Sequence, residues 1–404
     1  MSLFESTFPH PGFEKSTALL SPGKCDGNAL NGLTVRINDA CSLDQGFNLL
    51  KQIGKTSRAS VFQTDGWMRS VAEAALSKAG FEVRILLALD HTRPVAALPL
   101  CLDKRTGFKI ARILGAPLSQ YGDLLCEDSY LADATPVLEF ELATLRDVDL
   151  FIFSRVRDDA GIVTLLSALH AERFSESAAP YADLTKFNGF DEYLKGNWKA
   201  HRDRRRLRRR SRASGPLTFE VCSSPSRAAE LTKQAIDLKR RWLPGVHRWF
   251  GTLASDQWCG ALLNAINFPD TSIQPVVTAL HSRDKLAAIE IGFVHGQRYS
   301  AFLGAFDPFF RDWSPTQLLM EDTVAWCFRN KIEVYDLLPP DDRYKERWTT
   351  DKMPVADWIV SRSIKGRLYA EFFEKGLNRF IRRSSPHVQR LLKSGTSKIW
   401  RSPG

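Results

Sequence analysis

The sequence predicts a mixed α/β fold in which one α/β unit occurs twice along the chain. The main observation is an internal repeat: residues 88–100 align without a gap on residues 279–291, and in both copies two apolar strands flank a polar turn. A Leu-Gly-Ala tripeptide follows each copy, at 114–116 and again at 303–305. Strand pairs combined with helices predict a mixed sheet with helices on its faces.

The length of 404 residues exceeds one ordinary core and predicts two domains of about 150 residues plus tails. We expect a disordered leader at 1–31, a first domain at 32–180, a second at 181–364, and a basic amphipathic tail at 365–404. The leader has no apolar segment behind a basic start, so it does not look like a secretory signal.

Apolar periodicity and turn residues place the elements in chain order. The first unit is expected to hold a strand at 33–37, a helix at 65–78, hairpin strands at 83–90 and 95–102, strands at 108–114 and 148–153, and a helix at 160–170. The second is expected to hold helices at 189–211, 226–242, 257–266 and 314–330, and strands at 217–221, 276–280, 286–293, 299–306, 334–338 and 356–360. We expect no membrane span, because no run of 18 apolar residues occurs.

The net charge of +10 is concentrated in two segments. Residues 199–212 hold nine basic residues and one Asp, and residues 365–401 hold ten basic residues and two Glu. Each segment nets +8, so the rest of the chain is mildly acidic. The arginine run is open to three interpretations: a solvated basic helix, a site for a phosphate-bearing ligand, or a nucleic-acid contact.

The seven Cys form no C-x-x-C pair and have irregular spacings, which predicts reduced thiols in a cytoplasmic protein. No group of His, Cys and carboxylates has zinc-ligand spacing, so we expect no metal.

The segment Ser314-Pro315-Thr316-Gln317 predicts a helix start. Ser314 suits the N-cap, Pro315 suits the first helical position, and Gln317 would complete a capping box. An apolar strand precedes this start, and Arg311 adds a cation in the connecting loop. Free N–H groups and the helix dipole at such a junction can hold an anion, although a plain capped helix is the alternative.

Several short pieces of the sequence resemble one known family. They are Phe62-Gln63-Thr64-Asp65-Gly66-Trp67, Leu98-Pro99-Leu100, Leu114-Gly115-Ala116, Tyr121-Gly122-Asp123, Tyr193-Leu194 with the arginine-rich helix, Leu303-Gly304-Ala305-Phe306-Asp307-Pro308, Ser314-Pro315 with Leu318-Leu319, and Tyr344-Lys345 with Trp348. With these pieces in this order, the sequence resembles the BioF/CelD-type acetyltransferases, which are a GNAT-superfamily branch related to the FemAB peptidyltransferases. The resemblance implies two tandem GNAT-like domains.

The resemblance also implies an acyl-CoA donor site where the apolar strand gives way to the capped helix. The residues that it assigns to donor binding are Phe302, Leu303, Gly304, Arg311, Ser314, Thr316 and Gln317. Ser314 and Thr316 stand where the GNAT motif usually has Gly, so we expect weaker donor binding than in a typical GNAT. The first unit has no comparable helix start after Gly115-Ala116-Pro117, so we expect a degenerate partner that helps to form the acceptor cleft.

Acyl transfer requires orientation of two substrates, an oxyanion contact and proton transfer. Glu290 is the candidate base, although its strand position also fits a solvated sheet face. The resemblance places the stretch after residue 336 near the cleft and so implies Tyr344 as the candidate acid, with packing as its alternative, and Lys345 adjoins it. The residues assigned to the acceptor are Tyr121, Asp123, Arg205 and Asp336.

The resulting hypothesis is an acyl-CoA-dependent acyltransferase with an amine or hydroxyl acceptor of small or sugar type. The resemblance adds envelope or exopolysaccharide biosynthesis as the pathway. The alternatives are an aminoacyl-tRNA-dependent transferase and an inactive tandem scaffold. The tail has Leu368, Phe372, Phe373, Leu377, Phe380 and Ile381 at helical spacing among Lys and Arg, which fits docking on the protein itself or peripheral contact with an anionic membrane.

Overall fold

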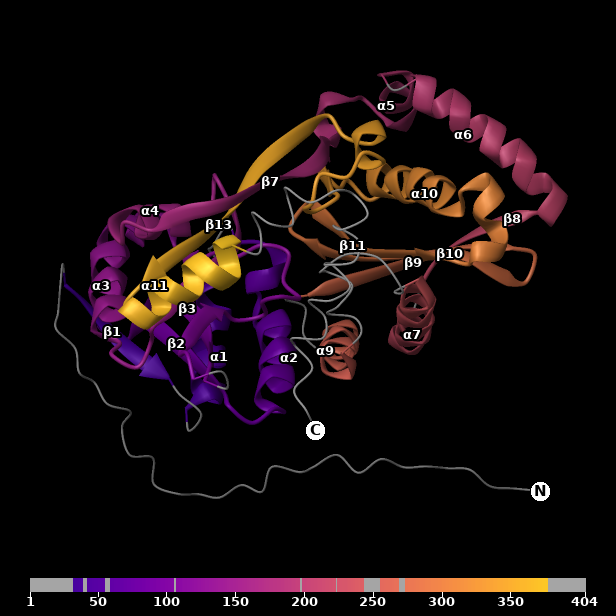
Figure 1. Cartoon of the computed structure of the whole chain (residues 1–404). Coiled ribbons are helices and arrows are strands. Elements are labelled where there is room, and N and C mark those ends of the chain that lie inside the picture. Colours follow the sequence, from indigo (N-terminus) through magenta and orange to yellow (C-terminus); the bar gives the residue numbers. More distant parts are fainter. Residues whose placement is uncertain are drawn as a thin grey trace.

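The structure, a computed structural model, describes residues 32–38, 42–54, 59–104, 107–196, 198–222, 224–242, 255–268 and 273–376. The expected leader at 1–31 and the tail beyond residue 376 lie outside the described residues. Two halves lie side by side (Figure 1), and each repeats the same series of elements.

The first half begins with a strand and two helices, then forms a hairpin and a strand–helix–strand unit. Its elements are β1 Leu33–Asn38, α1 Leu43–Ile53, α2 Asp65–Leu76, β2 Phe81–Asp90, β3 Arg93–Asp103, β4 Ile110–Ile113, β5 Leu125–Cys126, α3 Leu131–Thr144, β6 Leu150–Arg157, α4 Ile162–Ala168 and β7 Glu172–Asp183.

The second half adds two helices in front of the same series. Its elements are α5 Phe190–Gly196, α6 Trp198–Ser211, β8 Leu217–Val221, α7 Pro225–Trp242, α9 Asp256–Asn267, β9 Gln274–Ser282, β10 Lys285–His295, β11 Arg298–Phe306, the 3-10 turn η5 Pro308–Trp313, α10 Pro315–Arg329, β12 Val334–Asp336, β13 Asp351–Ser361, α11 Ile364–Tyr369 and the π-helical segment Ala370–Gly376.

One 13-stranded mixed sheet runs through both halves in the order β1-β2-β3-β4-β6-β13-β7-β12-β11-β10-β9-β8, with β5 paired to β3 outside this path. The order is symmetric about its centre. β1 to β4 and β6 correspond to β8 to β12, and α1, α2 and α3 correspond to α7, α9 and α10. The expected duplication of one α/β unit is therefore present.

The last strand of each half pairs with the other half. β7 ends the first half but pairs with β12, whereas β13 ends the second half but pairs with β6. The two exchanged strands also pair with each other. Figure 1 shows both crossing between the halves, so backbone hydrogen bonds join the halves at the centre of the sheet.

The two repeated hairpins share their geometry as well as their sequence. His91 and Arg283 open the turns with φ of 54° and 53°, and a β-bulge follows in β3 and in β10. Equivalent turn and bulge residues of the two hairpins are 192 positions apart in the chain. The gapless sequence alignment pairs residues that are 191 positions apart, so it is out of register with the structure by one residue. In structural register, Val95 therefore corresponds to Ala287 rather than to Leu286.

The halves also pack through their helices and an aromatic cluster. The equivalent helices α2 and α9 lie against each other at the junction (Figure 1). Phe62 and Trp67 of the first half contact Phe302 of the second at ring-centroid distances of 6.1 and 5.4 Å. Trp67 also contacts Phe293 at 5.4 Å. This buried cluster fixes β10 and β11 against the first half.

Four elements of the first half were not predicted: α1, β5, α3 and β7. The expectation that no helix matches α10 in the first half is wrong, because α3 occupies that place after a longer connection. Pro136 lies inside α3, and apolar residues are spread around it, which hides the helical pattern. β7 is largely polar and contains Pro180, so its sequence lacks the apolar pattern that predicts a strand. The single helix expected at 189–211 is the pair α5 and α6.

Candidate active site

A buried carboxyl group lies in the middle of β10. Glu290 is 5% exposed, and its Oε1 accepts a hydrogen bond from the Tyr299 hydroxyl at 3.0 Å. Both of its oxygens accept from the Tyr335 hydroxyl, each at 3.2 Å. Burial raises the pKa of Glu290 to about 7, although the two hydroxyl donors act to lower it. A carboxyl group with a pKa near 7 can exchange protons readily at neutral pH.

Strand register brings these three side chains together. Tyr299 of β11 is directly opposite Tyr335 of β12, and their rings stack at 5.5 Å with an interplanar angle of 11°. Gly292 leaves space for the Tyr299 ring, because a Cβ there would overlap it. Helix α10 packs over this part of the sheet and buries Cys327. The solvated-face interpretation of Glu290 is therefore wrong.

β12 pairs only with the beginning of β11. The parallel register joins Arg298–Ser300 with Val334–Asp336, and β11 then continues to Phe306, past the end of β12. Gly304 lies directly opposite Glu290 in the register of β10 with β11. Gly304 is exposed, and a Cβ on it would meet nothing within 4 Å. Because directly opposite residues share a face, the sheet is open next to the buried carboxyl group.

The predicted donor residues Phe302 and Leu303 require a correction. Phe302 is 5% exposed within the aromatic cluster, and Leu303 is 2% exposed. The register of β10 with β11 shifts at Phe302, which marks a β-bulge there. Both side chains are part of the core, so a donor molecule could contact only the backbone at these two positions.

The predicted capping box at the start of α10 is wrong, although the helix does begin at Pro315. Ser314 has a φ of 48°, and its side chain makes no cap hydrogen bond. The Gln317 amide oxygen instead accepts from the Trp348 indole N–H at 3.0 Å. The reason is local: η5 ends at Ser314 in the left-handed conformation. The first turn of α10 thus has no side-chain cap from Ser314, and η5 connects it to β11.

Two further predicted donor residues flank this helix start. Arg311 is in η5, and its side chain is 78% exposed. Thr316 is half-buried in the first turn of α10. Both positions are compatible with an anion at the start of the helix, and Arg311 would reach it from the solvent side.

Two predicted acceptor residues, one from each half, contact each other. The Tyr121 hydroxyl donates to both oxygens of Asp336 at 3.0 Å. Asp336 is 1% exposed and also accepts from Arg298 at 2.8 Å and from the Leu338 backbone N–H at 2.9 Å. Asp336 therefore connects the halves, and its carboxylate is occupied by the protein's own donors.

The side chain of Asp123 binds backbone groups of the first half. Its carboxylate accepts from the backbone N–H groups of Leu124 at 2.7 Å and Ile162 at 3.0 Å, and the second contact caps the start of α4. Burial raises the pKa of Asp123 to about 6. The expectation that Asp123 faces a cleft is therefore not met.

The candidate acid Tyr344 and its neighbour Lys345 differ in exposure. Lys345 is 5% exposed, and its ammonium group donates to the carbonyl oxygens of Leu338 at 2.8 Å and Pro340 at 2.7 Å. Burial lowers the pKa of Lys345 to about 8. Lys345 thus holds the chain that follows β12, whereas Tyr344 is 50% exposed.

The arginine-rich helix α6 lies along the outer edge of the second half (Figure 1) and is anchored to α10. Arg204 is 2% exposed, donates to Glu321 at 2.5 Å and stacks on the Trp348 ring at 4.2 Å. Arg208 donates to Glu321 and Asp322. These ion pairs neutralise part of the basic run. Other arginines of α6 are exposed: Arg202, Arg205, Arg206, Arg209 and Arg210. Arg205, a predicted acceptor residue, therefore faces solvent.

The first half carries apolar residues where the second half has Glu290 and its two tyrosines. The corresponding hairpin and strand registers place Leu98, Ala111 and Phe151 at these positions. All three are buried. The first half therefore lacks the carboxyl group and both hydroxyls.

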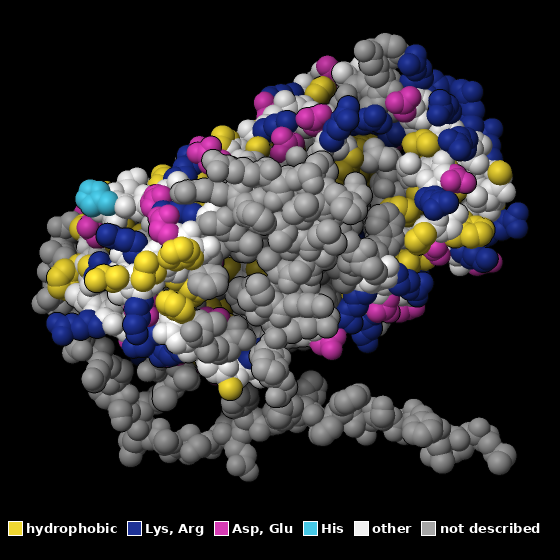
Figure 2. Space-filling model, in the orientation of Figure 1, with side chains coloured by type: hydrophobic (Ala, Val, Ile, Leu, Met, Phe, Trp, Pro, Cys, Tyr) yellow, Lys and Arg dark blue, Asp and Glu magenta, His cyan; other side chains and the backbone are white. Residues whose placement is uncertain are grey.

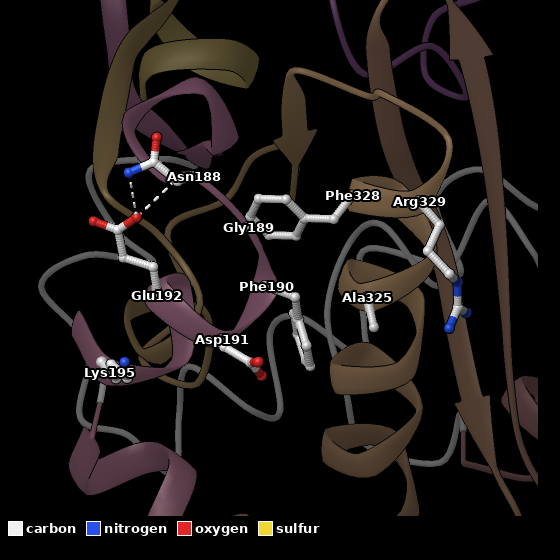
Figure 3. A pocket seen from close by; sticks show the side chains of 9 residues that line it. All are labelled: Asn188, Gly189, Phe190, Asp191, Glu192, Lys195, Ala325, Phe328 and Arg329. Carbon is white, nitrogen blue, oxygen red and sulfur yellow. Dashed lines mark hydrogen bonds between the residues drawn. The ribbon is translucent and has the colours of Figure 1, made fainter.

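A shallow pocket with a volume of about 630 Å³ lies elsewhere, between α5 and the end of α10. Figure 3 shows Phe190 and Phe328 facing it, with Asp191 and Arg329 at its border. It contains none of the predicted site residues.

Comparison with known proteins agrees with this geometry. Residues 199–346 match a family described as an acetyltransferase (GNAT) domain. Among solved structures, the chain is similar to FemX, with a TM-score of 0.57 and 11% identity over 82% of this chain and 98% of that one. It is also similar to the C-terminal domain (DUF2156) of a putative lysylphosphatidylglycerol synthetase from Agrobacterium fabrum, with a TM-score of 0.50 and 12% identity over 83% and 96% of the chains. No curated protein matches the sequence.

The fold is a tandem GNAT fold. Its two GNAT-like units are the two halves of the continuous sheet, and the family match lies in the second. Within the described ranges, no group of three or more His, Cys, Asp or Glu could hold a metal ion. No helix in those ranges is long and apolar enough to cross a membrane.

Proposed function

We propose that the second half is an acyltransferase that moves an acyl group from acyl-CoA to an amine or hydroxyl of a small or sugar-type acceptor. One observation carries this proposal: Glu290 is held by two tyrosine hydroxyls beside an opening at Gly304, where β11 outruns β12. The GNAT match includes all of these residues. The BioF/CelD resemblance supports an acceptor from envelope or exopolysaccharide biosynthesis.

The proposed donor site is the end of β11 together with the start of α10. Beyond Ser300, β11 continues past β12, so its extended backbone is suited to the amide groups of a pantetheine arm. The start of α10 offers a partial positive charge to a pyrophosphate, and Arg311 adds a cation. Thr316 stands in the first turn where the GNAT motif usually has Gly, and its side chain is expected to weaken donor binding.

The proposed chemistry is direct transfer. The acceptor nitrogen or oxygen attacks the thioester carbonyl, Glu290 takes the proton that the acceptor loses, and a backbone N–H of β11 stabilises the oxyanion. The carbon–sulfur bond then breaks, and the CoA thiolate takes up a proton that Tyr344 supplies. Tyr344 regains a proton from solvent, and Glu290 releases its proton there.

The test uses acetyl-CoA and a panel of amines and amino sugars, with release of the CoA thiol as the readout. Glu290→Gln should bind acetyl-CoA like the wild type in calorimetry but lower the transfer rate by roughly 10²–10⁴-fold. Glu333→Gln, at an exposed glutamate just before β12, is the matched control and should retain the rate. Failure of the wild type to bind acetyl-CoA would remove the donor assignment and favour the scaffold alternative.

A second candidate is aminoacyl transfer from a charged tRNA. It is favoured by the exposed arginines of α6, which the buried pair of Arg204 with Glu321 holds in place on α10. Arginine side chains in a row neutralise nucleic-acid phosphates. Loss of activity after RNase treatment would support this candidate, and RNase-resistant transfer from acetyl-CoA would reject it.

A further inference from the structure

Three large apolar side chains are exposed on the helical segment that follows β13. Ile364 is 82% exposed, Leu368 51% and Phe372 71%. They recur every four residues through α11 and the π-helical segment, so they lie on one side of the helix. We call these three residues the apolar stripe. A contiguous exposed apolar patch marks an interaction surface.

The other side of the same segment is anchored to the first half. Gly366 lies so close to the backbone of Asp149 that a Cβ would overlap it, and Ala370 is 1% exposed. Glu374 is 6% exposed and accepts from Arg112 at 3.0 Å. The segment therefore already has a core-facing side, and the apolar stripe is a second apolar face that the described fold leaves in solvent.

Positive charge borders the apolar stripe. Arg362, Lys365 and Arg367 are exposed beside it. The exposed Glu371 is paired with Lys375 at 2.6 Å, so its charge is compensated. Figure 2 shows hydrophobic side chains gathered over α11, with Lys and Arg side chains next to them. The sequence after Gly376 holds basic residues and neither Asp nor Glu; the basic residues are Arg379, Arg382, Arg383, Arg390, Lys393, Lys398 and Arg401. Apolar side chains with a basic border are typical of helices that lie in a membrane interface.

We infer that the apolar stripe docks this protein onto a membrane surface of acidic lipids. Charge decides between the possible occupants. The chain's own residues 377–404 would bring further positive charge against Lys365 and Arg367, and a second copy would place these cations against themselves. Acidic headgroups attract the basic border, and the acyl region accepts the apolar stripe. This inference does not rest on the proposed acyltransferase activity.

The test is co-sedimentation of the full chain with vesicles of phosphatidylcholine alone or of equal phosphatidylcholine and phosphatidylglycerol. The wild type should bind the acidic vesicles, and added salt should weaken the binding. The triple variant Ile364→Ser, Leu368→Ser, Phe372→Ser should bind roughly a hundredfold more weakly. Phe309→Ser is the matched control, because Phe309 is 75% exposed but lies in η5, whereas α11 packs on the first half, and this variant should bind like the wild type.

A second variant covers the case in which the triple variant does not fold. Lys365→Gln with Arg367→Gln leaves the apolar stripe intact and should weaken binding to acidic vesicles by roughly tenfold. Three results would overturn the inference: no wild-type binding to acidic vesicles, equal binding by wild type and triple variant, or a wild-type dimer in sedimentation velocity that the triple variant abolishes. Acetyl-CoA binding by calorimetry should be unchanged in the triple variant. The membrane contact and the proposed donor site are therefore tested independently of each other.

Discussion

Replacing Glu290 by Gln should make the protein's stability less dependent on pH. Glu290 has a pKa of about 7 in the fold, against an ordinary value of 4.5. Between these values the folded protein keeps a proton that the unfolded chain has released, so raising the pH through this window lowers the free energy of unfolding. At 1.36 kcal/mol per tenfold change in acidity, the full loss is about 3 kcal/mol. The loss is absent below pH 4.5 and complete above pH 7.

The Glu290→Gln variant keeps an acceptor for the two tyrosine hydroxyls, but its amide cannot ionise, so the variant lacks this loss. The assay is urea denaturation of wild type and Glu290→Gln at pH values from 4 to 8. The difference in unfolding free energy should grow in favour of the variant by about 3 kcal/mol across the range. The exposed-site variant Glu333→Gln should follow the wild type. Parallel curves for wild type and Glu290→Gln would refute the raised pKa and with it the reasoning about the base.

Three further outcomes follow from the contacts of the second half. Tyr335→Phe removes a hydroxyl that stabilises the charged form of the buried carboxyl group, so the midpoint of the pH–rate profile should move to higher pH. Arg204→Ala should lower the free energy of unfolding by about 3 kcal/mol in urea titrations, because it leaves a buried acidic partner short of a cation, whereas the adjacent exposed Arg205→Ala should change it by less than about 0.5 kcal/mol. Arg311→Ala should weaken acetyl-CoA binding by about 1–2 kcal/mol in calorimetry, and Thr316→Gly should leave it equal or tighter.

The repeat was readable from the sequence because each hairpin is local: its strands, turn and bulge lie within a short stretch. The exchange of β7 and β13 was not readable, because pairing between distant strands leaves no local pattern. β7 is also polar along much of its length and contains Pro180, so even its existence was hidden. The fold class was therefore predictable, and the central strand exchange was not.

The candidate base was found from the alternation around Glu290, but its partners were missed. Tyr299 and Tyr335 meet it only through the register of three strands, one of which follows a long helix. The sequence feature that could have revealed these partners is a Tyr at the second position of both β11 and β12. The arginine run shows the same limit, since the acidic partner of Arg204 lies 117 residues further along the chain. Asp336 was assigned to the acceptor, although buried contacts with donors from both halves occupy it.

The central claim is that Glu290 removes the acceptor's proton in an acyl-CoA-dependent transfer. The most direct measurement is kcat/KM for release of CoA from acetyl-CoA with the best amine of the panel, between pH 5.5 and 8.5, for the wild type and Glu290→Gln. The account predicts a wild-type rate that rises with pH through a midpoint near 7, where the carboxyl group loses its proton, and a Glu290→Gln variant that is slower by roughly 10²–10⁴-fold and lacks this midpoint. Equal rates with the same midpoint in both proteins would contradict it.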